Sequence, residues 1–273
     1  MIKFEHTLFA LPFALLSAIL ASGGLPKVSK LLWIILAMVG ARSAAMTFNR
    51  IADRQIDLEN PRTQTRALPA GHLSPAFAGW FTVASSLLFV IAAYELNPLC
   101  LWLSFPVLSI LLFYSYTKRI TTYTHLFLGL CLGLAPLGAW IAIRGDITPT
   151  PILLCLIVLL WTAGFDIIYA CQDLEFDRRK NLHSIPKRFG VRTALRMSSG
   201  FHLIMLALLI GLFFLEGLRW ISLLGISLVA CLLWYEHRLV RPNDLSKVNA
   251  AFFTVNSYIS VLLLVAVSLD KLI

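Results

Sequence analysis

The chain has 273 residues, of which 59% are hydrophobic and only 14% charged, and its mean hydropathy is +0.81. A soluble domain carries about 25% charged residues, so this composition excludes an ordinary soluble protein. Strong hydrophobicity without strict alternation also excludes an outer-membrane β-barrel. The net charge of +9 invites a nucleic-acid interpretation, but the placement of the charges along the chain argues against it.

The hydrophobic residues gather into long runs, as helices that cross a bilayer require. We predict an all-α membrane protein with nine transmembrane helices, forming a single domain over residues 1–273. The first run is short and follows Lys3, but Glu5 and His6 are atypical of a signal peptide, so we expect it to be a span. The predicted spans lie near residues 7–23, 29–48, 75–94, 98–116, 124–143, 150–170, 198–215, 219–236 and 249–268.

Lys and Arg residues lie mostly on one side of the predicted membrane. When the N-terminus is placed in the cytoplasm, seventeen of the 23 lie on that side and five on the other, with Arg42 left inside the second span. This asymmetry follows the positive-inside rule. We therefore expect a protein integral to the bacterial cytoplasmic (inner) membrane, with its C-terminus outside. The basic charge is then mostly a matter of topology, and no nucleic-acid partner is expected.

The second and sixth predicted spans each end in a group of carboxylates. Seven of the 14 Asp and Glu residues lie in two stretches, 49–59 and 166–177. Acids are unfavourable at the C-terminal end of a helix, where its dipole is negative, and are more costly still within a membrane. Cationic groups must therefore compensate them. The stretches are offset by 120 residues, Asp53 to Asp173 and Asp57 to Asp177, which suggests two pseudo-equivalent halves.

Each acidic stretch predicts a stripe of oxygen ligands, because residues four apart on a helix lie one above the other. Such oxygens suit Mg²⁺, which takes one or two protein carboxylates and completes its shell with water and phosphate oxygens. Two facing stripes would hold a diphosphate between metal ions, on loops that face the cytoplasm. The alternative is simple pairing of the acids with neighbouring Arg residues. The stripes consist of Asn49, Asp53 and Asp57, and of Asp166, Tyr169, Asp173 and Asp177.

Basic residues near these motifs could bind phosphate. Arg62 and Arg66 follow the first motif, and Lys118 and Arg119 close the fourth span. Guanidinium groups can orient phosphate oxygens through bidentate hydrogen bonds. Anchoring at the membrane surface is an equal alternative for Lys118 and Arg119.

Arg42 is unusual because it lies inside a predicted span. A buried Arg in a membrane helix needs an anionic partner. That partner is either a core acid such as Asp166 or a substrate carboxylate or diphosphate, which would make Arg42 a substrate-binding residue.

Several motifs together cover essentially the whole chain. They are the segment 3–7 leading into Ala-Leu-Pro, the two acidic motifs, the Leu-Pro-Ala-Gly run at 68–71 after Arg62 and Arg66, and Tyr-Thr-Lys-Arg at 116–119. With these motifs the sequence resembles the UbiA superfamily of intramembrane prenyltransferases. The resemblance implies nine helices around a central cavity, Mg²⁺ ions that bridge a polyprenyl diphosphate, and an opening for the lipid tail.

The resemblance also implies transfer of the polyprenyl group to an aromatic hydroxy-acid acceptor, in a membrane-lipid environment and without an obligate protein partner. Asp166 or the released diphosphate would remove the ring proton, and Tyr169 would orient a motif carboxylate. The implied metal ligands are Asn49, Asp53, Asp57, Asp173 and Asp177, and the implied diphosphate or acceptor ligands are Arg62, Arg66, Lys118 and Arg119.

The acceptor stays open. Many superfamily members carry Asp directly after the motif Asn, whereas this chain has Arg50, and together with segments 42–46 and 183–186 this resembles the futalosine-route menaquinone branch. Members of that branch are often labelled 4-hydroxybenzoate polyprenyltransferases. The candidates are therefore 4-hydroxybenzoate, for ubiquinone, and dihydroxynaphthoate, for menaquinone; a prenyltransferase of this type with another acceptor is a further alternative.

Two other classes of membrane protein are disfavoured. A CDP-alcohol phosphotransferase needs Asp-Gly-x-x-Ala-Arg ahead of its acidic pair, and the sequence lacks it. A cation-coupled transporter usually places ionisable residues near the membrane midplane. Here only Arg42 and Asp166 lie inside the spans, and the other acids gather at one face.

Overall fold

The computed structural model describes residues 7–273, and the regular elements in that part are helices. Each predicted span coincides with one long helix. Eight helical segments of the described part are long and apolar enough to cross a membrane, the last of them being Ala250–Leu272, whereas α1 is shorter. The long helices are α1 (Thr7–Ser22), α2 (Val28–Ala52), α4 (Pro75–Leu96), α5 (Pro98–Ile120), α6 (Thr124–Arg144), α7 (Pro149–Ala170), α10 (Val191–Leu215), α11 (Trp220–Leu239) and α12 (Asn256–Leu272). The motif at residues 3–7 falls almost entirely outside the described residues.

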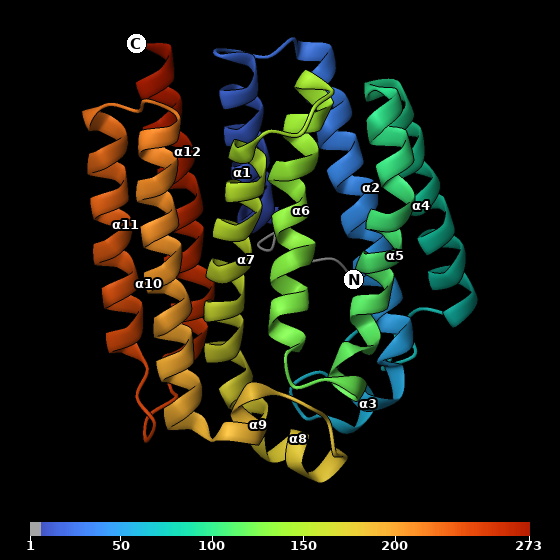
Figure 1. The fold of residues 1–273 in the computed structure, drawn as a ribbon. Helices are drawn as coiled ribbons and strands as arrows, with labels where there is room; N and C mark the ends of the chain where they lie inside the picture. Colours follow the sequence, from blue (N-terminus) through green and yellow to red (C-terminus); the bar gives the residue numbers. More distant parts are fainter. Residues whose placement is uncertain (1–6) are drawn as a thin grey trace.

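Short helical segments gather at one end of the bundle, which we call the capped end. Helices α3 (Arg54–Glu59), α8 (Leu174–Lys180) and α9 (Ile185–Phe189) lie there, at the bottom of Figure 1. The C-terminus lies at the opposite end. Both predicted acidic loops therefore meet at the same end. A 3₁₀ turn, Cys171–Asp173, joins α7 to α8, and a π-helix, Ala250–Val255, leads into α12.

Local sequence signals explain where several helices begin. Proline opens α4 and α5, where its missing N–H costs nothing. The preceding residue caps each helix: Ser74 Oγ accepts a hydrogen bond from Phe77 N (3.1 Å), and Asn97 Oδ1 accepts one from Cys100 N (2.8 Å). These caps satisfy backbone donors that the helix leaves unpaired.

Helix α7 occupies a central position, between α6 and α10 (Figure 1). Its contact with α6 uses two glycines one turn apart, Gly129 and Gly133. A Cβ at Gly133 would lie 2.6 Å from Cys155 O, and one at Gly129 would clash with Leu159 O. Such small residues let membrane helices approach closely. The large side chains of α7 fill the core; Trp161, for example, is fully buried.

Candidate active site

Both acidic motifs lie at a break between a long helix and a short one. Helix α2 ends at Ala52, and Asp53 separates it from α3, with φ −96° and ψ 5°. In the second motif Asp173 holds the same position before α8, with φ −93° and ψ 3°. This bridge region of the backbone is sparsely populated and often holds active-site residues. The shared geometry supports the predicted equivalence of the two halves.

The continuous stripes expected from the sequence are therefore interrupted, which corrects the prediction. Helical hydrogen bonding nevertheless persists across the first break. Asp53 N donates to Asn49 O (2.9 Å), and Asp57 N donates to Asp53 O (2.7 Å). These i, i+4 bonds link Asn49, Asp53 and Asp57 through the backbone. The loop after α3 then reaches the second motif, where Arg62 contacts Asp173.

Asp53 is 3% exposed and is surrounded by donors. Its Oδ2 accepts from Lys118 Nζ (2.6 Å) and Asn49 Nδ2 (3.1 Å), and its Oδ1 accepts from Arg119 Nη2 (3.0 Å). Arg119 also donates to Ala52 O (2.7 Å), a backbone carbonyl at the end of α2 that has no partner within the helix. The cations that close α5 are therefore part of the first acidic motif and not merely membrane anchors.

Asp57 is 4% exposed and is held mainly by Arg66. Arg66 Nη1 lies 2.8 Å from both carboxylate oxygens, and Arg50 Nη1 lies 3.8 Å from Oδ2. Thr63 Oγ1 donates to the backbone oxygen of Asp57 (3.0 Å), so the loop folds back over α3.

Arg62 connects the two motifs. Its Nε and Nη2 donate to Asp173 Oδ1 (3.1 Å) and Oδ2 (2.6 Å), and Asn60 Nδ2 reaches Oδ1 at 3.4 Å. Burial lowers the pKa of Arg62, but the hydrogen bonds and charge of Asp173 outweigh it and raise the pKa above its usual value, so the guanidinium stays cationic.

Tyr169 acts on Arg62 rather than on a carboxylate, which corrects the predicted role. Its hydroxyl accepts from Arg62 Nη1 (2.8 Å), and the guanidinium lies 5.0 Å from the ring centroid. The ring packs on Phe252 of the π-helix, with centroids 4.2 Å apart. Tyr169 therefore positions the group that holds Asp173.

The other two predicted site acids, Asp177 and Asp166, have neutral or imidazole partners. Ser184 Oγ donates to Asp177 Oδ2 (2.7 Å). His125 Nδ1 lies 2.7 Å from Asp166 Oδ2, while Ile185 N donates to His125 Nε2 (3.4 Å). With Nε2 used as an acceptor, the hydrogen bonds assign the proton to Nδ1, which donates to Asp166.

One of the predicted alternatives made Asp166 the anionic partner of Arg42, and the structure does not show this pair. The acid pairs with His125, and the Nε of Arg42 donates to Met46 Sδ (3.3 Å). Sequence reasoning missed His125 because its partner lies 41 residues away. The available signal was a polar residue in the first turn of a span, at the same end as the acids.

The acids and the cations intermix, so the alternative of acid–Arg pairing is partly confirmed. The partners of Asp53, Asp57 and Asp173 are mostly the predicted phosphate ligands rather than immediate neighbours. Glu175, in contrast, pairs with its neighbour Arg178. Within residues 7–273, no three His, Cys, Asp or Glu side chains converge into a metal site made of protein alone. Mg²⁺ does not require one, because it is commonly bound by one or two carboxylates together with substrate phosphates. The oxygen donors at the capped end fit that kind of site.

Long apolar helices with acidic and basic side chains paired at one end define an integral membrane protein whose polar chemistry sits at that end. The chain belongs to the UbiA prenyltransferase family, whose model matches residues 10–258. It is therefore a polyprenyltransferase.

Two relatives cover most of the chain. The 4-hydroxybenzoate octaprenyltransferase of Tolumonas auensis is 31% identical over 250 residues, which are 92% of this chain and 87% of that protein. The 4-hydroxybenzoate solanesyltransferase of Synechocystis is 30% identical over 267 residues, with 95% and 89% covered.

Solved structures show the same fold. The apo structure of a UbiA homologue from Aeropyrum pernix is 34% identical, with a TM-score of 0.90 and 100% of both chains covered. A UbiA homologue from Archaeoglobus fulgidus bound to DMAPP and Mg²⁺ has a TM-score of 0.63 at 19% identity, with 95% of this chain and 97% of that chain covered.

Proposed function

We propose that this protein transfers a polyprenyl group from polyprenyl diphosphate to an aromatic hydroxy acid, in a Mg²⁺-dependent step of respiratory quinone biosynthesis. The observation that carries the proposal is that both acidic motifs form ion pairs with four cations at the capped end. These cations are Arg62, Arg66, Lys118 and Arg119. Relatives named as 4-hydroxybenzoate prenyltransferases support the acceptor class, and the homologue with DMAPP and Mg²⁺ supports the metal and the allylic diphosphate. We take residues 1–273 to form one catalytic domain.

In this proposal the acids hold the metal and the cations hold the diphosphate. When bound, Mg²⁺ would supply positive charge that stabilises the diphosphate as a leaving group when the allylic C–O bond breaks. The cations bind and orient the phosphate oxygens, with Arg62 placed by Tyr169 and Asp173. The metal ligands are Asn49, Asp53, Asp57, Asp173 and Asp177, and the phosphate ligands are Arg62, Arg66, Lys118 and Arg119. For Arg42 we retain a role toward the substrate.

The allyl cation is attacked by a ring carbon ortho to a phenolic hydroxyl, and the ring proton must then leave. Asp166 or the released diphosphate accepts it. His125 orients the Asp166 carboxylate through the hydrogen bond from Nδ1–H to Oδ2 (2.7 Å).

The names of the relatives favour 4-hydroxybenzoate as the acceptor, whereas Arg50 and its neighbouring segments keep dihydroxynaphthoate as the second candidate. The test uses detergent-purified protein, Mg²⁺ and a soluble allylic diphosphate, with both acceptors in competition and mass spectrometry of the products. Prenylated hydroxybenzoate assigns the enzyme to ubiquinone synthesis, and prenylated naphthoate assigns it to menaquinone synthesis. If neither product forms with folded protein that binds the diphosphate, the acceptor class is wrong.

We further propose that the capped end faces the cytoplasm of a bacterial inner membrane. The Lys and Arg excess on the loops of that end supports this orientation. The C-terminus at the other end of the bundle (Figure 1) would then lie outside.

A further inference from the structure

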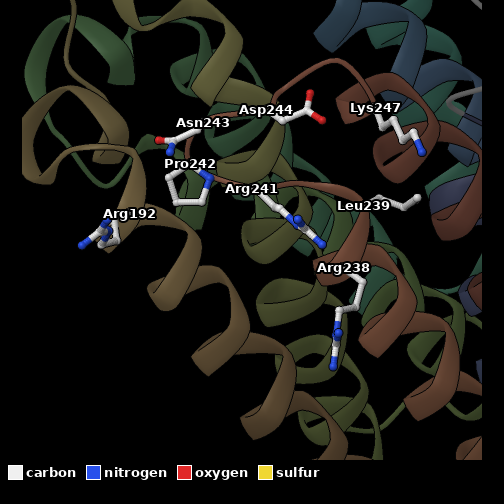
Figure 2. Close-up of a pocket in the computed structure, with 8 residues that line it drawn as sticks. All are labelled: Arg192, Arg238, Leu239, Arg241, Pro242, Asn243, Asp244 and Lys247. Carbon is white, nitrogen blue, oxygen red and sulfur yellow. The ribbon is translucent and has the colours of Figure 1, made fainter.

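A basic cavity lies apart from the acidic motifs, where α11 ends and the chain turns toward α12. It has a volume of about 510 Å³, and Figure 2 shows its lining. Four lining side chains are cationic and one, Asp244, is acidic. All five are exposed. The cations are Arg192 at the start of α10, Arg238 at the end of α11, and Arg241 and Lys247 in the connection to α12.

The lining of this cavity has a net positive charge, because one carboxylate, Asp244, is set against four cations. Within the described residues, none of the four forms an ion pair, whereas the cations of the acidic motifs do. The Asp244 carboxylate is engaged by Ser246, whose N and Oγ donate to it at 3.0 and 2.6 Å. A cavity with a net positive charge attracts an anion.

The loop that carries two of these cations is ordered by its own backbone. Arg241 N donates to Asp244 O and Asp244 N donates to Arg241 O, both at 3.0 Å. In Figure 2, the side chains of Arg241 and Arg238 extend to the same side of this loop, and Arg192 stands across from Pro242. The turn therefore fixes the backbone of the loop from which Arg241 and Lys247 extend.

The surroundings of the cavity are those of a membrane–water interface. Trp234 is 62% exposed and Tyr235 is 51% exposed near the end of α11, as is typical of aromatic belts. The Arg238 guanidinium lies 4.7 Å from the Trp234 ring centroid. Apolar faces of α10 and α11, with Leu203 and Leu228 exposed, extend from here along the bundle. A ligand with a phosphate at the cavity and acyl chains along these faces fits both features.

We propose that this cavity binds the phosphate headgroup of an anionic phospholipid, as basic pockets between membrane helices do. The site is distinct from the acidic motifs. It holds a structural or regulatory lipid rather than the substrate diphosphate, and the proposal does not depend on which acceptor the enzyme uses.

The test compares lipid binding by the purified full-length protein and by a variant with Arg192→Gln, Arg238→Gln, Arg241→Gln and Lys247→Gln. Binding is followed by native mass spectrometry as detergent-solubilised phosphatidylglycerol or phosphatidylcholine is titrated. We expect the affinity for phosphatidylglycerol to fall about tenfold or more and the affinity for phosphatidylcholine to stay unchanged. A matched variant, Arg178→Gln, Arg179→Gln, Lys180→Gln and Arg188→Gln, removes four exposed cations from the same end outside the cavity and should bind like the unaltered protein.

Three outcomes would overturn the proposal. The first is an equal loss in the matched variant, which would mean general attraction by surface charge. The second is unchanged phosphatidylglycerol binding when the four cations are removed and thermal unfolding shows a folded protein. The third is full displacement of the lipid by millimolar inorganic phosphate or diphosphate, which would assign the cavity to a free anion. Replacement of the three arginines by Lys, with Lys247 kept, should restore binding, because the attraction proposed for this cavity is electrostatic and Lys keeps the charge.

Discussion

Arg62 is the residue through which the two halves of the site communicate. It binds Asp173 with two nitrogens and Tyr169 with a third, although these partners lie more than a hundred residues further along the chain. Such a fork requires a planar guanidinium, because an ammonium group offers a compact charge without fixed directions. The contact makes Arg62 a sensitive test of how the motifs are coupled.

We expect Arg62→Lys to lower kcat by about tenfold or more, because the bidentate contact with Asp173 and the contact with Tyr169 cannot both be kept. Steady-state prenyl transfer measures the change. Arg178→Lys is the control, since the exposed Arg178–Glu175 pair lies in the same region and contributes little. Equal activity of Arg62→Lys and the unaltered enzyme would show that the fork is dispensable.

His125 is the residue-scale feature that the sequence did not reveal. It is 3% exposed, and its Nδ1–H is paired with Asp166. Replacing it by Leu leaves the carboxylate without its donor, so we expect a destabilisation of about 1–3 kcal/mol. Thermal unfolding in detergent measures it, and His125→Asn, which keeps a donor, should recover part of the loss. Unfolding of His125→Leu at the same temperature as the unaltered protein would contradict the assigned pair.

At the scale of elements, the apolar runs were sufficient to predict every long helix, because hydrophobicity and length determine where a chain can span a bilayer. The breaks at Asp53 and Asp173 were not predictable in the same way. The i, i+4 spacing of the acids predicts a continuous helix. Only the backbone dihedral angles of Asp53 and Asp173 show that the helix is interrupted at these residues. Contacts between distant segments, such as Arg62 with Asp173, also leave no local pattern.

Another unpredicted element is the π-helix that precedes Asn256. Asn256 is fully buried and bonds both Trp161 Nε1 (2.7 Å) and Glu236 Oε1 (2.9 Å). The bulge places Phe252 against Tyr169. Such bulges frequently lie near functional sites. A segment of six residues is too short for its sequence to show a distinct period, so the π-helix could not be predicted.

The approach of α6 to α7 gives a prediction about elements. Gly133→Ala should destabilise the protein by about 1–3 kcal/mol, because its Cβ would press on the backbone of α7 and force the helices apart. Gly138→Ala on the same helix is the control, since nothing lies within 4 Å of its Cβ. Unfolding in detergent should separate the two variants. If they unfold alike, the close contact between the helices is not where the structure has it.

At the scale of the whole molecule, the bundle carries its polar chemistry at one end and its C-terminus at the other (Figure 1). The charge pattern of the sequence already predicted this arrangement, since Lys and Arg mark one side of the membrane. The charge pattern could not predict which cations belong to the candidate active site and which line the basic cavity, because both groups follow the positive-inside rule. Their partners, and not their positions in the sequence, distinguish them.

This arrangement predicts the location of the C-terminus. Alkaline phosphatase fused after Ile273 should be active in cells, because it is exported, whereas a fusion after Lys180 in the capped end should be inactive. Enzyme assays on whole cells compare the two fusions. The reverse pattern would invert the proposed orientation.

The central claim is that both acidic motifs act on one diphosphate. Its most direct test measures Mg²⁺-dependent prenyl transfer by Asp53→Asn, Asp173→Asn and the double variant, with Glu175→Gln as a folded control from the second motif. We predict that each single variant loses about 100-fold or more in kcat and that the double variant loses little beyond that, because residues that act as a unit are not additive. Losses that multiply in the double variant, or full activity in either single variant, would contradict the claim.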